Sequence, residues 1–183
     1  MTISDELQRI YGQRGGAAYF GEAVTVTEHG LQAAHFARVA GAGEALIVAA
    51  LLHDIGHLVE WVPDDINDWR TDAQHELIGS RWLARHFGPE VSEPVRLHVP
   101  AKRYLCATDR DYVGKLSAAS VHTLELQGGP MRQTEIAAFE AEPFASDAII
   151  IRRCDDQGKV AGLAVPGLEH YRSTIERLAG RSP

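Results

Sequence analysis

The residues best suited to chemistry are His53 and Asp54, which follow the apolar run of residues 45–52. An imidazole beside a carboxylate is costly at the end of a buried helix, and a bound cation would offset that cost. Neutral imidazole nitrogen and ionised carboxylate oxygen together suit a borderline or hard divalent metal ion. A second interpretation is a helix-end pair in which Asp54 accepts backbone hydrogen bonds. For this dipeptide alone, that interpretation is equally good.

Further residues of metal-binding type are spread along the chain, each at an end or on the inner face of a predicted helix. They are His29, His75, His98 and Asp155. Four ligands hold one metal ion, whereas six ligands that include a bridging carboxylate suit two ions a few ångströms apart. The number of candidate ligands therefore favours a metal site over the helix-end interpretation.

Helix-start and helix-stop signals place these residues in a chain of helices. Thr2 with Asp5, and Thr25 with Glu28, have the spacing of capping boxes. The predicted helices cover residues 2–10, 25–39, 44–54, 72–87, 94–98, 109–116, 118–127, 134–140, 145–154 and 167–179. Gly56 should terminate the third helix. The fifth should end before Pro100, because a proline disfavours helical backbone at the preceding residue. Strand-like alternation is nearly absent, so the sequence predicts an all-α fold, a single helical bundle over residues 1–183.

Composition limits the class of protein. Lysine and arginine number 18 against 25 aspartate and glutamate, a net charge of −7 that argues against nucleic acid or an anionic membrane as partner. Cys106 and Cys154 lack the spacing of a zinc knuckle or a disulfide framework. The N-terminus lacks a signal pattern and no apolar run has the length of a membrane span. The sequence therefore predicts a soluble cytoplasmic protein and leaves its oligomeric state open.

The order His, His-Asp, His, His, Asp resembles that of the HD-domain superfamily in its six-ligand dinuclear form. Within it, the chain is similar to the HD-domain oxygenases of organophosphonate breakdown, whose type member cleaves 2-amino-1-hydroxyethylphosphonate. The matching segments span most of the chain: YFGE at 19–22, EH at 28–29, HDIGH at 53–57, QHE at 74–76, HVPAKRYL at 98–105, QGGPM at 127–131 and VPG at 165–167. KRYL and QGGPM are far more specific to this branch than the HD pair.

The resemblance implies a single HD domain with two iron ions in a mixed-valent Fe(II)/Fe(III) pair. One ion would be held by His29, His53, Asp54 and Asp155, and the other by Asp54, His75 and His98, with Asp54 as the bridge. Asp156 could compete with Asp155 for the ligand role, and Cys154 stands where relatives tend to have an aromatic residue. The histidines that match no motif position are His35, His86, His122 and His170.

Three cations lie within four residues of a predicted ligand: His57, Lys102 and Arg152. If the ligands converge, these side chains can offer charge-assisted hydrogen bonds to a phosphonate dianion, and relatives use the matching residues in that way. The alternative is that Lys102 and Arg152 form ordinary surface ion pairs. The resemblance adds Ser120 and Gln127 as residues that line the substrate pocket.

Tyr19 and Glu22 lie in a glycine-rich stretch before His29. In relatives the matching tyrosine occupies an iron when substrate is absent, with the glutamate hydrogen-bonded close by. The resemblance therefore implies a lid, and catalytic roles for Tyr19 and Glu22 as well as for His57. Without the family, ordinary turn residues would explain Tyr19 and Glu22 nearly as well.

The reaction that the resemblance implies is dioxygen-dependent cleavage of the carbon–phosphorus bond of a 1-hydroxy-2-(trimethylammonio or amino)ethylphosphonate. Its products are phosphate and glycine betaine or glycine. Trp61 and Trp69 would offer aromatic faces to a quaternary ammonium, which slightly favours the trimethylated substrate. The main alternative is an HD-type metal-dependent phosphohydrolase that acts on nucleotides. The third interpretation is a noncatalytic helical module with a structural metal ion. Six ligands beside cations, however, exceed what a structural metal site requires.

Overall fold

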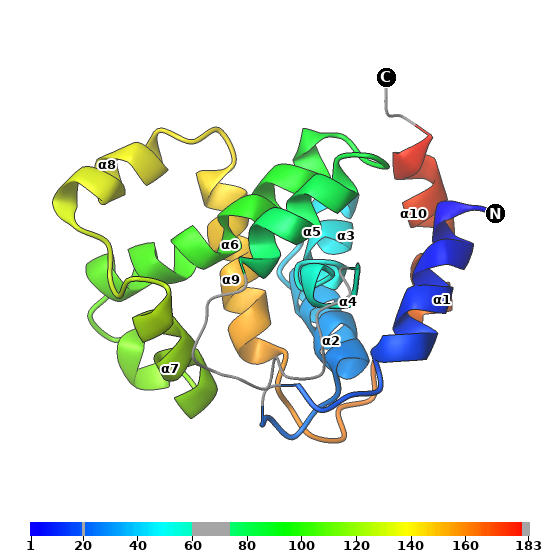
Figure 1. Cartoon of the computed structure of the whole chain (residues 1–183), viewed down its shortest axis with the longest axis horizontal. Helices are drawn as coiled ribbons and strands as arrows, with labels where there is room; N and C mark the ends of the chain where they lie inside the picture. Colours follow the sequence, from blue (N-terminus) through cyan, green and yellow to red (C-terminus); the bar gives the residue numbers. More distant parts are fainter. Residues whose placement is uncertain (20, 60–73, 181–183) are drawn as a thin grey trace.

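The computed structural model describes residues 1–19, 21–59 and 74–180 as helices joined by turns (Figure 1). The α-helices are α1 (Ile3–Arg14), α2 (Val26–Val39), α3 (Glu44–Leu51), α4 (Gly56–Val59), α5 (His75–Leu83), α6 (Pro89–Thr108), α7 (Ala118–Leu126), α8 (Gln133–Glu140), α9 (Ala145–Gln157) and α10 (Arg172–Ala179). Short 3-10 helices cover Val113–Lys115 and Leu168–Tyr171. Within the described ranges the only strand-like pairing is a single bridge between Ala18 and Thr25, so the predicted all-α fold is confirmed.

The predicted capping boxes begin the first two helices. The Asp5 backbone amide donates to the Thr2 hydroxyl over 3.2 Å, and the Thr2 amide donates to the Asp5 carboxylate over 3.1 Å. Thr25 and Glu28 make the same reciprocal pair, with distances of 3.2 and 2.7 Å. Each pair satisfies two backbone donors that lack a partner within the helix. The second box fixes the start of α2, the helix that carries His29.

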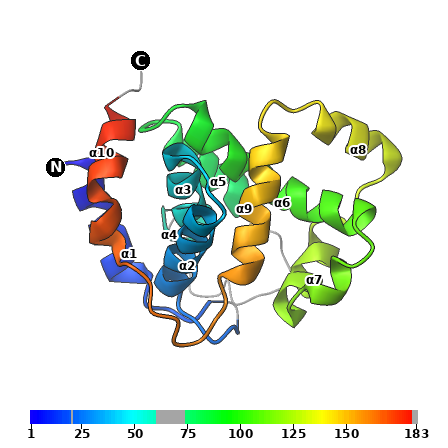
Figure 2. The ribbon, with the colours of Figure 1, turned by 180° about the vertical axis from the view of Figure 1, so that it is seen from behind.

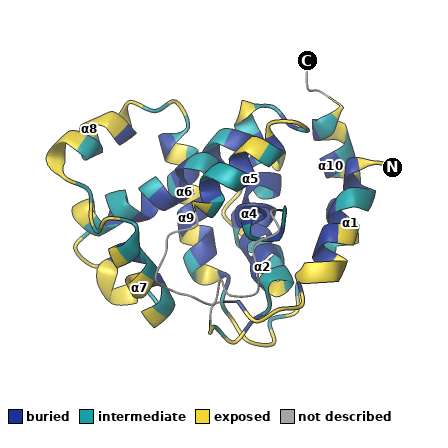
Figure 3. Ribbon diagram, in the orientation of Figure 1, coloured by how far each residue is buried: buried dark blue, intermediate teal, exposed yellow. Residues whose placement is uncertain are grey.

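The helices that carry the candidate ligands form the centre of the molecule. Helix α6 packs against α9, α5 and α3, and α2 packs against α3 and α9. Both views of the ribbon place the pair α1 and α10 on one side of this centre, and α7 and α8 on the other (Figures 1 and 2). Buried residues gather on the central helices, whereas α7 and α8 are largely exposed (Figure 3). The site is therefore built from rigid, packed elements.

Helix α6 differs from its predicted extent. The expected end before Pro100 is wrong, because α6 continues to Thr108 with Pro94 and Pro100 inside it. A proline removes one helical hydrogen bond, yet Ala101 and Leu105 beyond it are buried against the rest of the molecule. Burial of this second half outweighs the missing hydrogen bond. As a result His98 and Lys102 lie one turn apart on the same face of one helix.

Other boundaries also shifted. The predicted helix 44–54 ends at Leu51, and Gly56, expected to terminate it, begins α4 instead. The predicted helix 109–116 is only the 3-10 turn Val113–Lys115. Part of the predicted helix 72–87 and both Trp61 and Trp69 lie outside the described residues. No described helix combines the length and apolar character needed to cross a membrane.

Candidate metal centre

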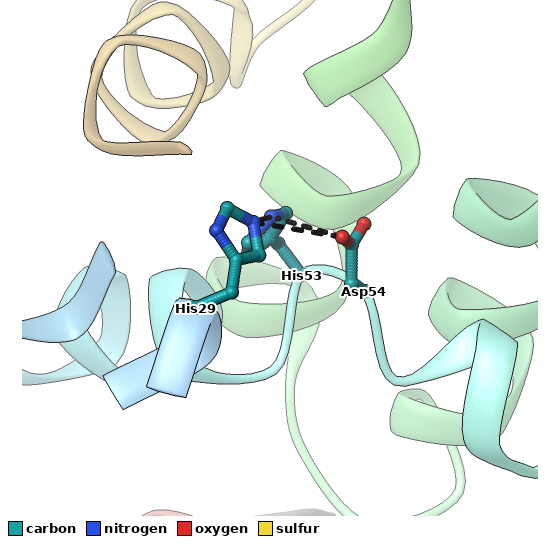
Figure 4. A group of neighbouring side chains, drawn as sticks. All are labelled: His29, His53 and Asp54. Atoms are coloured by element: carbon teal, nitrogen blue, oxygen red, sulfur yellow. Dashed lines mark hydrogen bonds and ion pairs between the residues drawn. The ribbon is translucent and has the colours of Figure 1, made fainter. Parts of the chain in front are cut away.

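The six predicted ligands come from five different segments and meet in the interior. His29 lies in α2, His75 begins α5, His98 lies in α6 and Asp155 lies in α9. The pair His53 and Asp54 occupies the turn between α3 and α4, which turns both side chains inward (Figure 4). All six are buried or nearly so. Five of the six form two groups that share Asp54: His29, His53 and Asp54, and Asp54, His75 and His98.

The Asp54 carboxylate lies between the two groups. Its Oδ2 atom is 3.7 Å from His29 Nε2 and 3.5 Å from His53 Nε2. Its Oδ1 atom is 3.2 Å from His75 Nε2 and 3.6 Å from His98 Nε2. One oxygen therefore faces each pair of imidazoles, the arrangement of a carboxylate that bridges two metal ions. We call the His29 and His53 side the first metal position, and the His75 and His98 side the second.

Hydrogen bonds at the far side of the rings leave the Nε2 atoms available as ligands. The Nδ1 atom of His29 lies 2.9 Å from the Gly158 carbonyl oxygen, and those of His53 and His98 lie 2.8 and 2.7 Å from carbonyl oxygens of their own helical segments. A carbonyl oxygen only accepts, so Nδ1 must carry the proton and donate. The Nε2 lone pair of each ring then points at Asp54 and its neighbours.

The electrostatics of the site favour the ligand forms of these residues. Burial lowers the pKa of His53 to about 4, so its imidazole is neutral at physiological pH. Burial opposes ionisation of Asp54, but the surrounding imidazoles of His53, His75 and His98 hold its pKa well below the usual value. A neutral imidazole and an ionised carboxylate are the forms that bind metal ions.

Two carboxylate oxygens in the site indicate that cations belong there. Asp54 Oδ2 and Asp155 Oδ1 are buried and have no hydrogen-bond donor within the described part of the chain. A buried anionic oxygen without a donor is strongly unfavourable unless a cation binds it. Imidazoles combined with bridging and terminal carboxylates suit iron among the transition metals. The residues present therefore fit a dinuclear metal centre.

The competition between Asp155 and Asp156 for the ligand role can be followed in their contacts. Asp155 Oδ1 lies 3.4 Å from His29 Nε2, and Oδ2 lies 3.9 Å from His53 Nε2. Asp156 instead accepts hydrogen bonds from Tyr112 and Arg152. Asp155 alone of the two faces the first metal position. Arg152 and Lys159 hold its pKa well below the usual value against the effect of burial.

Lys102 and Arg152 are buried beside the metal centre, so the interpretation as surface ion pairs is wrong. The ammonium of Lys102 donates to the Thr123 hydroxyl over 2.9 Å. Arg152 has more partners, since it binds Asp155 over 2.7 Å and also contacts Tyr112 and Asp156. Arg152 therefore orients a ligand as well as contributing charge.

Lys159 is a cation of the site that the sequence analysis did not single out. Its Nζ atom lies 3.7 Å from Asp155 Oδ1, 3.9 Å from Glu22 Oε1 and 2.9 Å from the Ser120 hydroxyl. The backbone beside it is clamped, because the Gln32 amide both donates to and accepts from the Val160 backbone. Sequence spacing could have indicated Lys159, because it follows the candidate ligand Asp155 by four residues, as Lys102 follows His98.

Tyr19 and Glu22 lie at the first metal position. The Tyr19 ring stacks on the His29 ring, with centroids 3.9 Å apart and planes inclined by 18°. Burial and the nearby Asp54 carboxylate raise the pKa of the Tyr19 hydroxyl well above its usual value, so it is a neutral phenol. Glu22 Oε1 is buried near Lys159. Both side chains are therefore packed onto the site.

The remaining predicted pocket residues lie on α7 and α4, and they occupy different places: Ser120 contacts Lys159, whereas His57 lies against the ligand His75. Ser120 is buried on α7 and accepts from Lys159, while Gln127 ends that helix with its Oε1 atom buried and without a donor in the described ranges. His57 lies on α4 and stacks on the His75 ring at 4.1 Å. Burial, together with the neighbouring His75, lowers the pKa of His57 to about 3.

The four histidines that match no motif position lie apart from both groups of ligands. Neither of the two ligand groups that share Asp54 contains His35, His86, His122 or His170, and no further group of this kind is found among the described residues. His35 packs edge-on against Phe36 and His86 against Trp82. These two contacts are those of packing residues.

The helical fold and this ligand set define a class of protein. The family model described as "HD domain" matches residues 26–156, a range that contains all six ligands. The chain belongs to the HD-domain family, in the branch of HD-domain phosphonate dioxygenases.

Particular relatives place it within that branch. The chain is 49% identical over 177 residues to hydroxymethylphosphonate dioxygenase of Gimesia maris, covering 96% of this chain and 86% of the relative. It is 42% identical over 180 residues to the glycine-betaine-forming [1-hydroxy-2-(trimethylamino)ethyl]phosphonate dioxygenase of Leisingera caerulea, covering 98% and 92%. An uncharacterized protein, L432, of Acanthamoeba polyphaga mimivirus is 37% identical over 91% of this chain and 77% of its own.

Proposed function

We propose that this protein is a diiron dioxygenase that cleaves the carbon–phosphorus bond of a 1-hydroxyphosphonate. The supporting observation is the pair of buried ligand groups that share Asp54, with the buried Lys102 and the half-buried Lys159 close by. The relatives named for this reaction match the chain over nearly its whole length. In the overall reaction, a 1-hydroxyphosphonate and dioxygen give a carboxylic acid and phosphate.

The residues of this chain divide the work between metal binding and substrate binding. His29, His53 and Asp155 would hold one iron, His75 and His98 the other, and Asp54 both. A mixed-valent iron pair supplies the electron and the dioxygen chemistry that no amino-acid side chain provides. Lys102 and Lys159 bind the phosphonate oxygens through charge-assisted hydrogen bonds, and Arg152 adds its charge while it orients Asp155.

The other pocket residues position the substrate and exclude water. His57, Ser120 and Gln127 line the pocket around the phosphonate. The side-chain amide of Gln127, whose Oε1 atom is buried without a donor in the described part of the chain, can donate an N–H to a phosphonate oxygen. Tyr19 and Glu22 cover the first metal position and give way when the substrate hydroxyl arrives. Water is thereby kept from the metal ions until substrate binds.

Among candidate substrates we place hydroxymethylphosphonate first. The relative named for it is 49% identical to this chain. The Glu22 carboxylate already faces Lys159, so its charge needs no ammonium group from the substrate. The trimethylammonio compound, supported by the 42% identical relative and by Trp61 and Trp69 outside the described residues, is the alternative. The primary amine is the third compound to compare.

The function is tested by incubating iron-loaded protein with each of the three phosphonates, with and without dioxygen. We expect phosphate release only when dioxygen is present, together with formate from hydroxymethylphosphonate. Comparison of kcat/KM then ranks the substrates, and we expect hydroxymethylphosphonate to lead by at least about tenfold, or about 1.4 kcal/mol. Phosphate release without dioxygen, or activity on nucleotides with another divalent metal, would instead support the phosphohydrolase.

Replacing Lys102 by methionine should weaken catalysis and stabilise the metal-free protein. Loss of a charge-assisted hydrogen bond to the phosphonate, worth about 1.5–3 kcal/mol, lowers kcat/KM about 10- to 100-fold. Methionine also removes a buried ammonium that is 2% exposed, which should raise the free energy of unfolding by about 1–4 kcal/mol. Chemical denaturation and steady-state kinetics measure both effects, with the exposed Lys115→Met as the control.

The stability gain of Lys102→Met should depend on pH. Burial and the nearby Arg152 lower the pKa of Lys102 from 10.5 to about 7. The unfolded chain therefore keeps the lysine proton between about pH 7 and 10.5, where the folded protein releases it, and wild-type stability rises with pH across this window. Below pH 7 the folded wild type bears the full cost of a buried, charged Lys102. The gain in the free energy of unfolding of Lys102→Met over wild type should therefore shrink between pH 6 and pH 9. An advantage that is constant across this range would contradict the burial argument.

A further inference from the structure

Three of the four ligand histidines share one supporting contact, and the fourth has a carboxylate beside it. The Nδ1 atoms of His29, His53 and His98 each lie within 2.9 Å of a backbone carbonyl oxygen. The Nδ1 atom of His75 instead faces a carboxylate, Glu76 Oε2, at 3.7 Å. The two metal positions therefore differ in the groups behind their ligands, and not only in the number of ligands.

Glu76 is a buried carboxylate next to a ligand histidine, and buried carboxylates are uncommon in proteins. It is 7% exposed, and its Oε2 atom is buried without a hydrogen-bond donor in the described ranges. An ionised carboxylate in such surroundings carries a large desolvation cost unless positive charge lies close to it. A cation bound at the Nε2 atom of the adjacent His75 ring provides that charge. The geometry thus couples Glu76 to occupancy of the second metal position.

The distribution of charge around the two positions supports this coupling. The first position contains a second carboxylate, Asp155, whose charge is offset by Arg152 at 2.7 Å and Lys159 at 3.7 Å. The second position has two imidazoles and a share of Asp54, but no carboxylate of its own among the described residues. Glu76 places a carboxylate oxygen 3.7 Å from the Nδ1 atom of a ligand of that position. It supplies negative charge through His75 where direct ligands do not.

We infer that Glu76 is a positioning residue that orients His75 and strengthens metal binding at the second position selectively. A carboxylate behind a ligand imidazole fixes the ring orientation and makes the ligand nitrogen more basic. Removal of such a partner typically lowers metal affinity about 10- to 100-fold. The inference concerns metal binding and rests on the dinuclear centre, so it is tested without substrate or turnover.

Glu76→Gln, which keeps the shape of the side chain and removes its charge, is the test variant. Metal-free protein is titrated with Mn(II) by calorimetry, and electron paramagnetic resonance distinguishes a coupled pair of ions from an isolated one. We expect two binding events in the wild type. In Glu76→Gln one event should weaken about 10- to 100-fold with the other unchanged, so that the coupled-pair signal appears only at higher Mn(II) concentration.

Glu28→Gln is the matched control, because Glu28 also adjoins a ligand histidine but directs its carboxylate to the Thr25 backbone amide. Glutamine still serves in a capping box, so both Mn(II) affinities should stay at the wild-type values. Unchanged affinities in Glu76→Gln with a lower melting temperature of the metal-free protein would overturn the inference, since Glu76 would then only stabilise the start of α5. Equal weakening of both events would overturn it too.

The outcome is separable from that of the proposed function. Oxygen-dependent phosphate release can fail while Glu76→Gln still weakens one Mn(II) site, which would leave a dinuclear protein of another activity. Conversely, catalysis on a phosphonate with equal Mn(II) binding by wild type and Glu76→Gln would reject the role of Glu76 alone.

Discussion

Asp54→Asn should abolish stable binding of both metal ions, and with it all oxygen-dependent turnover. Asp54 is the one side chain that belongs to both ligand groups, with one oxygen toward each pair of imidazoles. An amide carries no negative charge and presents one oxygen instead of two, so neither position keeps its anionic bridge. Mutation of a residue that only supports a ligand typically lowers metal affinity about 10- to 100-fold. Loss of the shared ligand should lower the affinity more than this at both positions.

The measurement is metal content per chain after anaerobic loading with Fe(II) and removal of free ion, alongside phosphate release. Wild type should retain two ions and Asp54→Asn none. Asp147→Asn serves as the control, because Asp147 lies in the first turn of α9 and outside both groups of ligands. Retention of one tightly bound ion by Asp54→Asn would show that the two positions form independently, which contradicts the bridging role.

The candidate ligands could be proposed from the sequence because they depend on residue type and order, and five of them lie in the two groups that share Asp54. Imidazoles and carboxylates at costly interior positions, such as His53 and Asp54, limit the possible explanations to a few. The capping boxes at Thr2 and Thr25 were predictable for a similar reason, since each depends on two residues three positions apart. Local rules of this kind are independent of the tertiary structure.

Features that depend on packing between distant segments were not predictable. Helix α6 passes Pro100 because the second half of the helix is buried, and no local signal contains that information. The role of Lys159 depends on how Gln32 in α2 holds the backbone of Val160. The contrast between Glu76 and the carbonyl partners of the other histidines likewise required coordinates. Sequence reasoning therefore identified ligands better than the groups that position them.

Gly56 is a residue of the HDIGH segment that appeared to be only a helix terminator, and its replacement should have a large and selective effect. It begins α4 where that helix crosses the start of α5. A Cβ atom placed on it would lie 2.0 Å from the His75 carbonyl oxygen and 2.9 Å from the Gly79 backbone nitrogen. Cβ atoms in proteins essentially never approach other heavy atoms within 3.0 Å. Because the obstructing atoms belong to the backbone, a side-chain rotation cannot relieve the contact.

Gly56→Ala should therefore push α5 away from α4 and withdraw His75 from Asp54, whose facing atoms now lie 3.2 Å apart. Overpacking of this kind costs about 1–3 kcal/mol or more in stability. We expect one retained iron per chain instead of two, because His29 and Asp155 lie on α2 and α9, whose backbones the added Cβ atom does not meet, and we expect no turnover.

Gly12→Ala is the control for Gly56→Ala, since a Cβ atom at that exposed position in α1 meets nothing within 4 Å. Alanine is the better helix former by about 0.5–1 kcal/mol, so this variant should be slightly stabilised and fully active with two ions. Two ions at wild-type affinity in Gly56→Ala would mean that α5 tolerates the displacement, and that the close approach of the two helices does not position His75. A single remaining ion, by contrast, would identify this glycine as the contact on which the second metal position depends.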